Sequence, residues 1–117
     1  VDVGPEVITG STRMKSGTAQ KMVLNMLSTG AMSRLGKVYG NLMVDVKPSN
    51  EKLVCRCKSI VRTATGADEA TAAAALKQCG YESKTAIVMI KKGVDCAQAR
   101  ALLAQAQGRV AAALQTP

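Results

Sequence analysis

Side chains able to do chemistry are concentrated near the amino-terminal end, where a carboxylate is followed by two hydroxyls and two cations: Glu6, Ser11, Thr12, Arg13 and Lys15. Hydroxyl groups donate hydrogen bonds to phosphate oxygens, and Arg and Lys add the charge that a phosphate attracts. If a helix begins just after these residues, its first free backbone N–H groups also favour an anion. The spacing is therefore compatible with a sugar phosphate as ligand.

Each of these residues also has a purely structural explanation. Ser and Thr before a helix are caps more often than ligands. Single Arg or Lys side chains in a first turn are usually solvated. A carboxylate at Glu6 can simply complement the positive end of the helix dipole.

The elements that must position these side chains are a strand end and a helix. Residues 1–3 read as the end of a strand entering a turn at Gly4-Pro5, and we expect the sheet to be built by residues upstream of Val1. Residues 9–12 provide an amino-terminal cap for a helix that runs through residues 19–35. Because this segment is apolar over most of its girth, we predict a buried helix.

The remainder is also expected to be helical. Residues 41–46 fit either an irregular turn or a helical stretch. Ser49 or Asn50 is expected to cap a helix that ends at Gly66. Three shorter helices follow: one starts at Thr65 or Asp68 and ends at Gly80, one is capped by Ser83 and ends at Gly93, and one is capped by Asp95 and covers residues 97–114. Their arrangement resembles in shape the small bundle of ubiquitin-associated (UBA) domains.

Composition narrows the classes of function. Sixteen Lys and Arg against eight acidic residues give a net charge of +8, but the cations are dispersed and lack interleaved aromatic residues, which argues against nucleic acid as a partner. Apolar runs are too short to span a bilayer, so no membrane partner is expected. Four cysteines without any histidine, and no C-x-x-C pair, favour reduced thiols over zinc. The absence of an initiator Met suggests a piece of a longer protein.

One run of residues is specific enough to indicate a family. Residues 4–21, GPEVITGSTRMKSGTAQK, resemble a signature shared by N-acetylmuramic acid 6-phosphate etherases and the glucokinase regulatory protein. Residues 24–32 and 36–46 are similar to the bacterial etherases in particular, and so are residues 64–66 and 84–90. The resemblance covers essentially the whole chain, and it corresponds to the carboxyl-terminal part of the family's chain.

The resemblance implies a mainly helical chain: residues 1–47 end a sugar-isomerase (SIS) phosphosugar-binding domain, an α/β sandwich around a parallel sheet, and residues 48–117 form a UBA-like helical domain. It implies a cytoplasmic homodimeric lyase that cleaves the D-lactyl ether of its sugar-phosphate substrate by elimination and hydration, with no cofactor and no metal. The family's acid and base glutamates lie upstream of Val1, so the fragment alone is expected to be inactive. Glu6, Ser11, Thr12, Arg13 and Lys15 remain as substrate-binding candidates.

Two other functions are compatible with the sequence. The first is a non-catalytic sugar-phosphate sensor of the glucokinase-regulator type, against which the etherase-like residues 36–46 argue. The second is an independent helical module, residues 50–114, whose basic surface docks a protein or nucleic acid.

Overall fold

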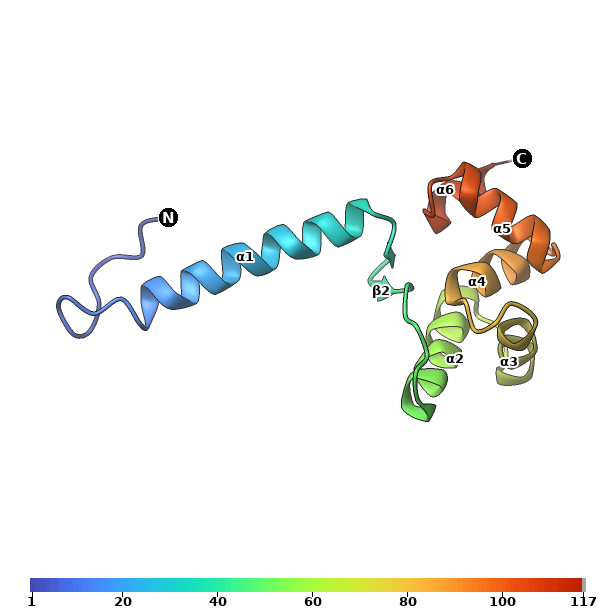
Figure 1. Cartoon of the computed structure of the whole chain (residues 1–117), viewed down its shortest axis with the longest axis horizontal. Helices are drawn as coiled ribbons and strands as arrows, with labels where there is room; N and C mark the ends of the chain where they lie inside the picture. Colours follow the sequence, from blue (N-terminus) through green and yellow to red (C-terminus); the bar gives the residue numbers. More distant parts are fainter. Residues whose placement is uncertain (117) are drawn as a thin grey trace. The chain divides into compact units, whose positions relative to one another are not determined.

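The computed structural model describes residues 1–116 and is mainly helical, as predicted (Figure 1). Its elements are α1 (Lys15–Arg34), β1 (Val38–Tyr39), β2 (Leu42–Met43), α2 (Glu51–Thr65), α3 (Glu69–Gln78), α4 (Ser83–Lys92), α5 (Cys96–Gln105) and α6 (Val110–Gln115). The chain divides into two compact units, Val1–Arg34 and Leu35–Pro117, which we call the amino-terminal unit and the helical unit. The predicted division at residue 47 concerns the longer protein and stays a prediction.

The amino-terminal unit consists of an irregular segment followed by α1. Contrary to the prediction of a buried helix, α1 contains no buried residue. Leu24 and Leu27 are each 66% exposed, and no charged residue occurs between Lys21 and Arg34. The prediction was wrong because, within the amino-terminal unit, no other element covers the apolar sides of this helix.

A short antiparallel hairpin opens the helical unit, and its second strand, β2, lies in residues 41–46, which the sequence left undecided between a turn and a helix. Val38 pairs with Met43 and Tyr39 with Leu42, around a turn at Gly40. The N–H of Val44 then donates to the carbonyl of Lys37 at 3.0 Å, and the Val44 side chain is buried in the core. The hairpin is therefore anchored to the helices that follow it.

Local capping signals set the bounds of α2 and α3. The Asn50 side chain accepts a hydrogen bond from the Leu53 N–H, and Gly66 ends α2 in the left-handed conformation. The Asp68 side chain caps α3 by accepting from the Thr71 N–H. These caps confirm the predicted helix start at Asn50, its end at Gly66 and the start at Asp68.

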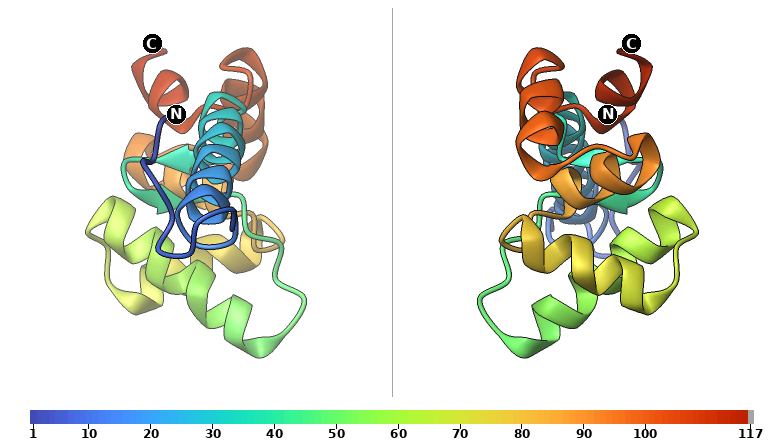
Figure 2. Two further views of the ribbon diagram at one scale, coloured as in Figure 1. Left: turned by 90° about the vertical axis from the view of Figure 1, so that its left-hand side faces the viewer. Right: turned by 90° about the vertical axis from the view of Figure 1, so that its right-hand side faces the viewer.

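Helix α4 lies at the centre of the helical unit, where it packs against α2, α3, α5 and α6 (Figure 2). Six of its ten residues are buried, among them Ile87 and Val88. The predicted cap at Ser83 was wrong: Glu82 holds the cap position and Ser83 is the first helical residue, buried in the unit. Gly93 ends the helix as predicted.

The last predicted helix, residues 97–114, is interrupted in the structure. Asp95 forms a capping box with Gln98 and starts α5 as predicted, but Gln107 and Gly108 adopt positive φ and separate α5 from α6. The break lets α6 turn back onto α4 and bury Val110 and Ala113.

Small apolar residues make up much of the core. Leu76, Ile87, Val61 and Val88 are its larger members, and alanines fill the positions between closely packed helices. Within residues 1–116 no helix combines the length and apolar character needed to cross a bilayer.

Candidate functional site

The predicted site residues lie in the segment that leads into α1. Gly4 and Gly10 have positive φ, and the N–H of Ser11 donates to the carbonyl of Ile8 at 3.0 Å to close a turn. The carbonyl of Thr12 then accepts from the N–H of Gly17 at 3.1 Å, within the first turn of the helix. The segment therefore folds back on itself before the helix begins.

Glu6 occupies the amino-terminal end of α1. Its two carboxylate oxygens accept hydrogen bonds from the backbone N–H groups of Lys15, at 3.1 Å, and Ser16, at 3.2 Å. These two bonds, the one from Lys15 first, hold the pKa of Glu6 below its ordinary value. The structural explanation of Glu6, a carboxylate at the positive end of the helix dipole, thus matches its contacts.

The other four candidates are brought to the same helix end but are not joined into one network. The hydroxyl of Ser11 accepts a long hydrogen bond, 3.4 Å, from the N–H of Arg13. Thr12, Arg13 and Lys15 are exposed, and within residues 1–116 neither Arg13 nor Lys15 takes part in an ion pair. Their cationic side chains are therefore available to an anion.

This geometry changes how an anion would be held. Sequence reasoning expected free N–H groups at the helix start, but those of Lys15 and Ser16 already donate to Glu6. An anionic ligand must then use the Arg13 and Lys15 side chains and the hydroxyls of Ser11 and Thr12, or displace the Glu6 carboxylate. The assignment of the five residues as substrate ligands stays a prediction.

A second group of polar contacts, in the helical unit, was not found from the sequence. The Lys84 ammonium donates to the carbonyls of Gly36 and Gly108, both at 3.4 Å, and pairs with Asp45 at 3.3 Å. Lys37 pairs with the same carboxylate at 3.2 Å. Partners 24 to 48 residues apart give no local signal, so only the fold reveals this cluster.

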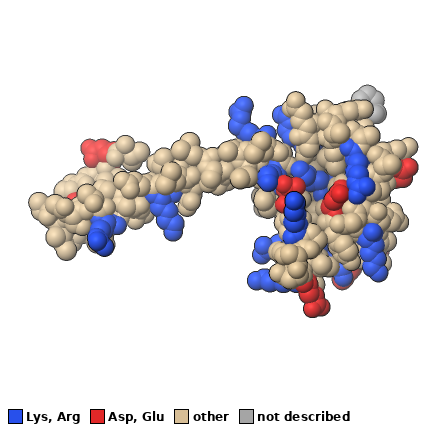
Figure 3. All heavy atoms as spheres, in the orientation of Figure 1, with Lys and Arg blue, Asp and Glu red and all other residues tan. Residues whose placement is uncertain are grey.

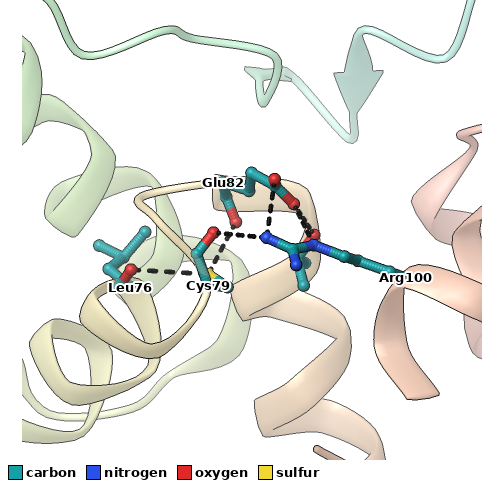
Figure 4. A network of polar contacts seen from close by, with 5 residues as sticks. Leu76, Cys79, Glu82 and Arg100 are labelled. Atoms are coloured by element: carbon teal, nitrogen blue, oxygen red, sulfur yellow. Dashed lines mark hydrogen bonds and ion pairs between the residues drawn. The ribbon is translucent and has the colours of Figure 1, made fainter. Parts of the chain in front are cut away.

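Figure 4 shows a third network, which ties the turn after α3 to α5. The Arg100 guanidinium donates to both carboxylate oxygens of Glu82, at 3.1 and 3.0 Å, and to the carbonyl of Cys79. The hydrogen bonds from Arg100 hold the pKa of Glu82 below its ordinary value. Thr85 donates its hydroxyl hydrogen to the same carboxylate at 2.7 Å.

Cysteine chemistry offers no metal centre in the part of the chain that the structure describes. All four thiols are free, and Cys57 and Cys79 are buried. Burial raises the pKa of the Cys79 thiol, which disfavours the thiolate that binds metals. Residues 1–116 contain no cluster of three or more side chains suited to holding a metal ion.

Comparisons with known proteins agree with the resemblance seen in the sequence. No family model matches the chain. Curated proteins named "N-acetylmuramic acid 6-phosphate etherase" are similar to it over 112 residues, or 96% of the chain: 61% identical for Aliivibrio fischeri (strain MJ11), 62% for Serratia proteamaculans (strain 568) and 63% for Yersinia pestis (strain Pestoides F).

Coverage of the relatives is much smaller than coverage of the chain. The chain spans 37% of the Aliivibrio protein and 38% of the Serratia and Yersinia proteins. High identity along almost the whole chain, combined with this partial span, is what the sequence predicted for a part of a longer protein. The chain is homologous to a segment that makes up about a third of the length of proteins named N-acetylmuramic acid 6-phosphate etherase.

Proposed function

We propose that this chain is the carboxyl-terminal part of an N-acetylmuramic acid 6-phosphate etherase, a carbon–oxygen lyase. The observation that carries the proposal is the 61–63% identity to proteins of that name along 96% of the chain. The reaction removes the proton at C2 of the opened sugar, expels D-lactate from C3 and adds water, giving N-acetylglucosamine 6-phosphate. The acid and base belong to the part of the protein that precedes Val1.

Within that enzyme, residues 1–47 complete the SIS phosphosugar-binding domain and residues 48–117 form the UBA-like helical domain. The exposed apolar surface of α1 supports the first assignment. A helix that is apolar on most sides requires neighbours on most sides, as in a helix packed into an α/β sandwich. Figure 3 shows a long uncharged stretch of this helix between charged residues.

The segment before α1 supplies ligands for the sugar phosphate in this proposal. Arg13 and Lys15 carry the positive charge that a phosphate needs, and Ser11 and Thr12 offer hydroxyl donors. Glu6 has a positioning role because its carboxylate fixes the first turn of α1 through two N–H groups. No acid or base role is assigned to any residue of this chain.

The localisation, oligomeric state and cofactor requirement that we propose rest on the same resemblance. We propose a cytoplasmic homodimer that requires neither a metal ion nor an organic cofactor and has no nucleic acid partner. The dispersed cations of the helical unit, visible in blue in Figure 3, support the last point because they form no continuous stripe on that face.

The test is D-lactate release from N-acetylmuramic acid 6-phosphate by the longer protein that contains this chain. Lactate is expected from that protein and none from the 117-residue chain alone. Arg13→Met in the longer protein should raise KM about tenfold, because one charge-assisted contact to the phosphate is lost. Lys21→Met, farther along the same helix, is the matched control and should leave KM unchanged.

The two rival functions predict different results. Binding of the sugar phosphate by the longer protein without lactate release would favour a regulatory protein and contradict the lyase. Salt-dependent binding of duplex DNA by the 117-residue chain would favour an independent interaction module.

A further inference from the structure

The helical unit contains a cavity that the proposed etherase function does not use. Its volume is about 370 Å³, within the range of small-molecule pockets in proteins. Residues 44–48 line one part of it, the start of α4 lines another, and the middle and end of α5 contribute Arg100, Leu103 and Ala104. Val44, Val46, Pro48 and Leu103 provide apolar lining, so the body of a ligand would be apolar.

The start of α4 adds hydrogen-bond donors to this cavity. Helices α2, α3 and α5 each begin with a side chain that accepts from a first-turn N–H, from Asn50, Asp68 and Asp95. Glu82 holds the cap position of α4 but forms no such bond, because its carboxylate is engaged by Arg100 and Thr85. The first N–H groups of α4, which a helix cannot satisfy internally, are therefore without a side-chain cap.

Ser83 provides an independent observation at the same place. The residue lines the cavity and is only 1% exposed, and its Oγ has no hydrogen-bond partner within the described residues. Buried hydroxyls in proteins almost always have a partner. An acceptor atom bound in the cavity would satisfy both this hydroxyl and the first turn of α4.

Charge around the cavity limits the ligand to a monoanion. Three cations and two carboxylates line it, which leaves one positive charge in excess: Lys47, Lys84, Arg100, Asp45 and Glu82. Both carboxylates are paired, Asp45 with Lys84 at 3.3 Å and Glu82 with Arg100 at 3.0 Å. A single added carboxylate would neutralise the excess positive charge, whereas a phosphate dianion would leave the apolar-lined cavity with a net negative charge and would lose more hydration free energy on entering it.

We propose that this cavity binds a small organic acid, with one carboxylate at the Ser83 hydroxyl and the first turn of α4 and an apolar body against Val44 and Leu103. The proposal is independent of the etherase assignment, which concerns the segment before α1. It adds a second ligand site, in the helical unit.

The experiment is an amide NMR titration of the 117-residue chain with three probes: butyrate, its uncharged isostere butyramide, and inorganic phosphate. Butyrate should give saturable shifts centred on the N–H groups of Ser83, Lys84 and Thr85. Butyramide and phosphate should give at least tenfold weaker binding or none. Equal response to butyramide, saturation by phosphate but not butyrate, or no saturable shift at all would overturn the proposal.

Substitution of the buried hydroxyl separates a ligand site from a hydroxyl that merely packs in the core. Ser83→Ala should weaken butyrate binding about tenfold, and Ser83→Cys, which keeps the volume with a weaker donor, should weaken it less. Ser59→Ala on the exposed side of α2 is the matched control and should bind as the parent does. Unchanged butyrate affinity in folded Ser83→Ala would overturn the role assigned to this residue and the proposal with it.

Discussion

The two units of this chain use apolar residues in opposite ways. Every helix of the helical unit contributes buried residues to one shared core, whereas α1 contributes none. In α2 the buried residues Cys57, Ile60 and Val61 follow helical spacing on one side, so the remaining surface is free to face solvent. The apolar content of a helix alone therefore does not show whether the residues that bury it lie in the same unit of the chain.

The two units also differ in the source of their stability. The core formed by residues 35–116 is expected to stabilise the helical unit by itself, while α1 finds no covering surface within the amino-terminal unit. In proteins most of a helix's stability comes from tertiary packing of its apolar face. The following predictions test whether the two units differ as sharply in solution.

The largest expected effect comes from the centre of the core. Leu76→Ala removes a side chain that is 0% exposed, and it should lower the free energy of unfolding by about 2–5 kcal/mol. Urea unfolding followed by tyrosine fluorescence measures this, because Tyr39 and Tyr81, the two tyrosines of the chain, both lie in the helical unit.

The matched control for this substitution is Leu27→Ala on α1. Its side chain is 66% exposed, and the free energy of unfolding obtained from the tyrosine transition should change by less than about 0.5 kcal/mol. A comparable loss in the two variants would mean that α1 belongs to the same cooperative core, and the contrast between the units would fail.

A glycine in each unit gives the second comparison. Gly36 has φ of +72°, and an added Cβ would lie 2.9 Å from the Gly108 carbonyl oxygen. Gly36→Ala should destabilise the helical unit by roughly 2–3 kcal/mol, through left-handed strain and a backbone clash. The measurement is again the urea midpoint of the tyrosine signal.

Gly30→Ala should act in the opposite direction. Gly30 lies inside α1, and nothing within 4 Å would meet an added Cβ. Alanine should therefore stabilise the helix by up to about 1 kcal/mol, seen as stronger helical circular dichroism with an unchanged tyrosine transition. Loss of helical signal would instead indicate that Gly30 is in close contact with another surface.

Local signals account for the part of the fold that the sequence predicted. Asn50, Asp68, Asp95, Gly66 and Gly93 act within a few residues, so their caps can be identified without knowing the tertiary structure. The break before α6 was missed although Gly108 was a visible signal, because the flanking alanines fit a continuous helix. The short hairpin carries only two residues in each strand, too few for an alternating pattern.

In the candidate sites too, local contacts could be predicted from the sequence and long-range contacts could not. The contact of Glu6 with the start of α1 was among the predicted alternatives, because a carboxylate shortly before a helix has a local reason to be there. The Lys84 contacts and the cavity beside Ser83 depend on residues brought together by packing, so no spacing in the sequence indicated them.

Acid should weaken the helical unit through Asp45. Burial raises the pKa of this carboxyl, but the hydrogen bond from Lys37 and the charge of Lys84 outweigh burial and lower it overall. A lowered pKa gives stability that is present above the unfolded value and is lost as pH falls through the folded value. Asp45→Asn should therefore cost about 0.5–1 kcal/mol at pH 7, after allowance for solvent screening, and progressively less as pH falls towards pH 2.

Urea midpoints of the parent and the Asp45→Asn variant at the two pH values measure this difference. Asp2→Asn, in the exposed amino-terminal segment, is the control and should leave both midpoints unchanged. A gap between parent and Asp45→Asn that persists at low pH would show that the side chain acts through packing and not through its charge.

The smallest effect is expected at the start of α1. Glu6→Gln weakens two hydrogen bonds from backbone N–H groups, so the first turn should fray while the tyrosine transition stays in place. In the parent, the amide shifts of Lys15 and Ser16 should titrate together below the usual pKa range of glutamate.

If these amide shifts do not titrate, Glu6 leaves the two N–H groups free and the helix start itself can receive a phosphate. If they do, a phosphate must either displace Glu6 or rely on Arg13 and Lys15, and the pH dependence of substrate binding by the longer protein then distinguishes those two routes.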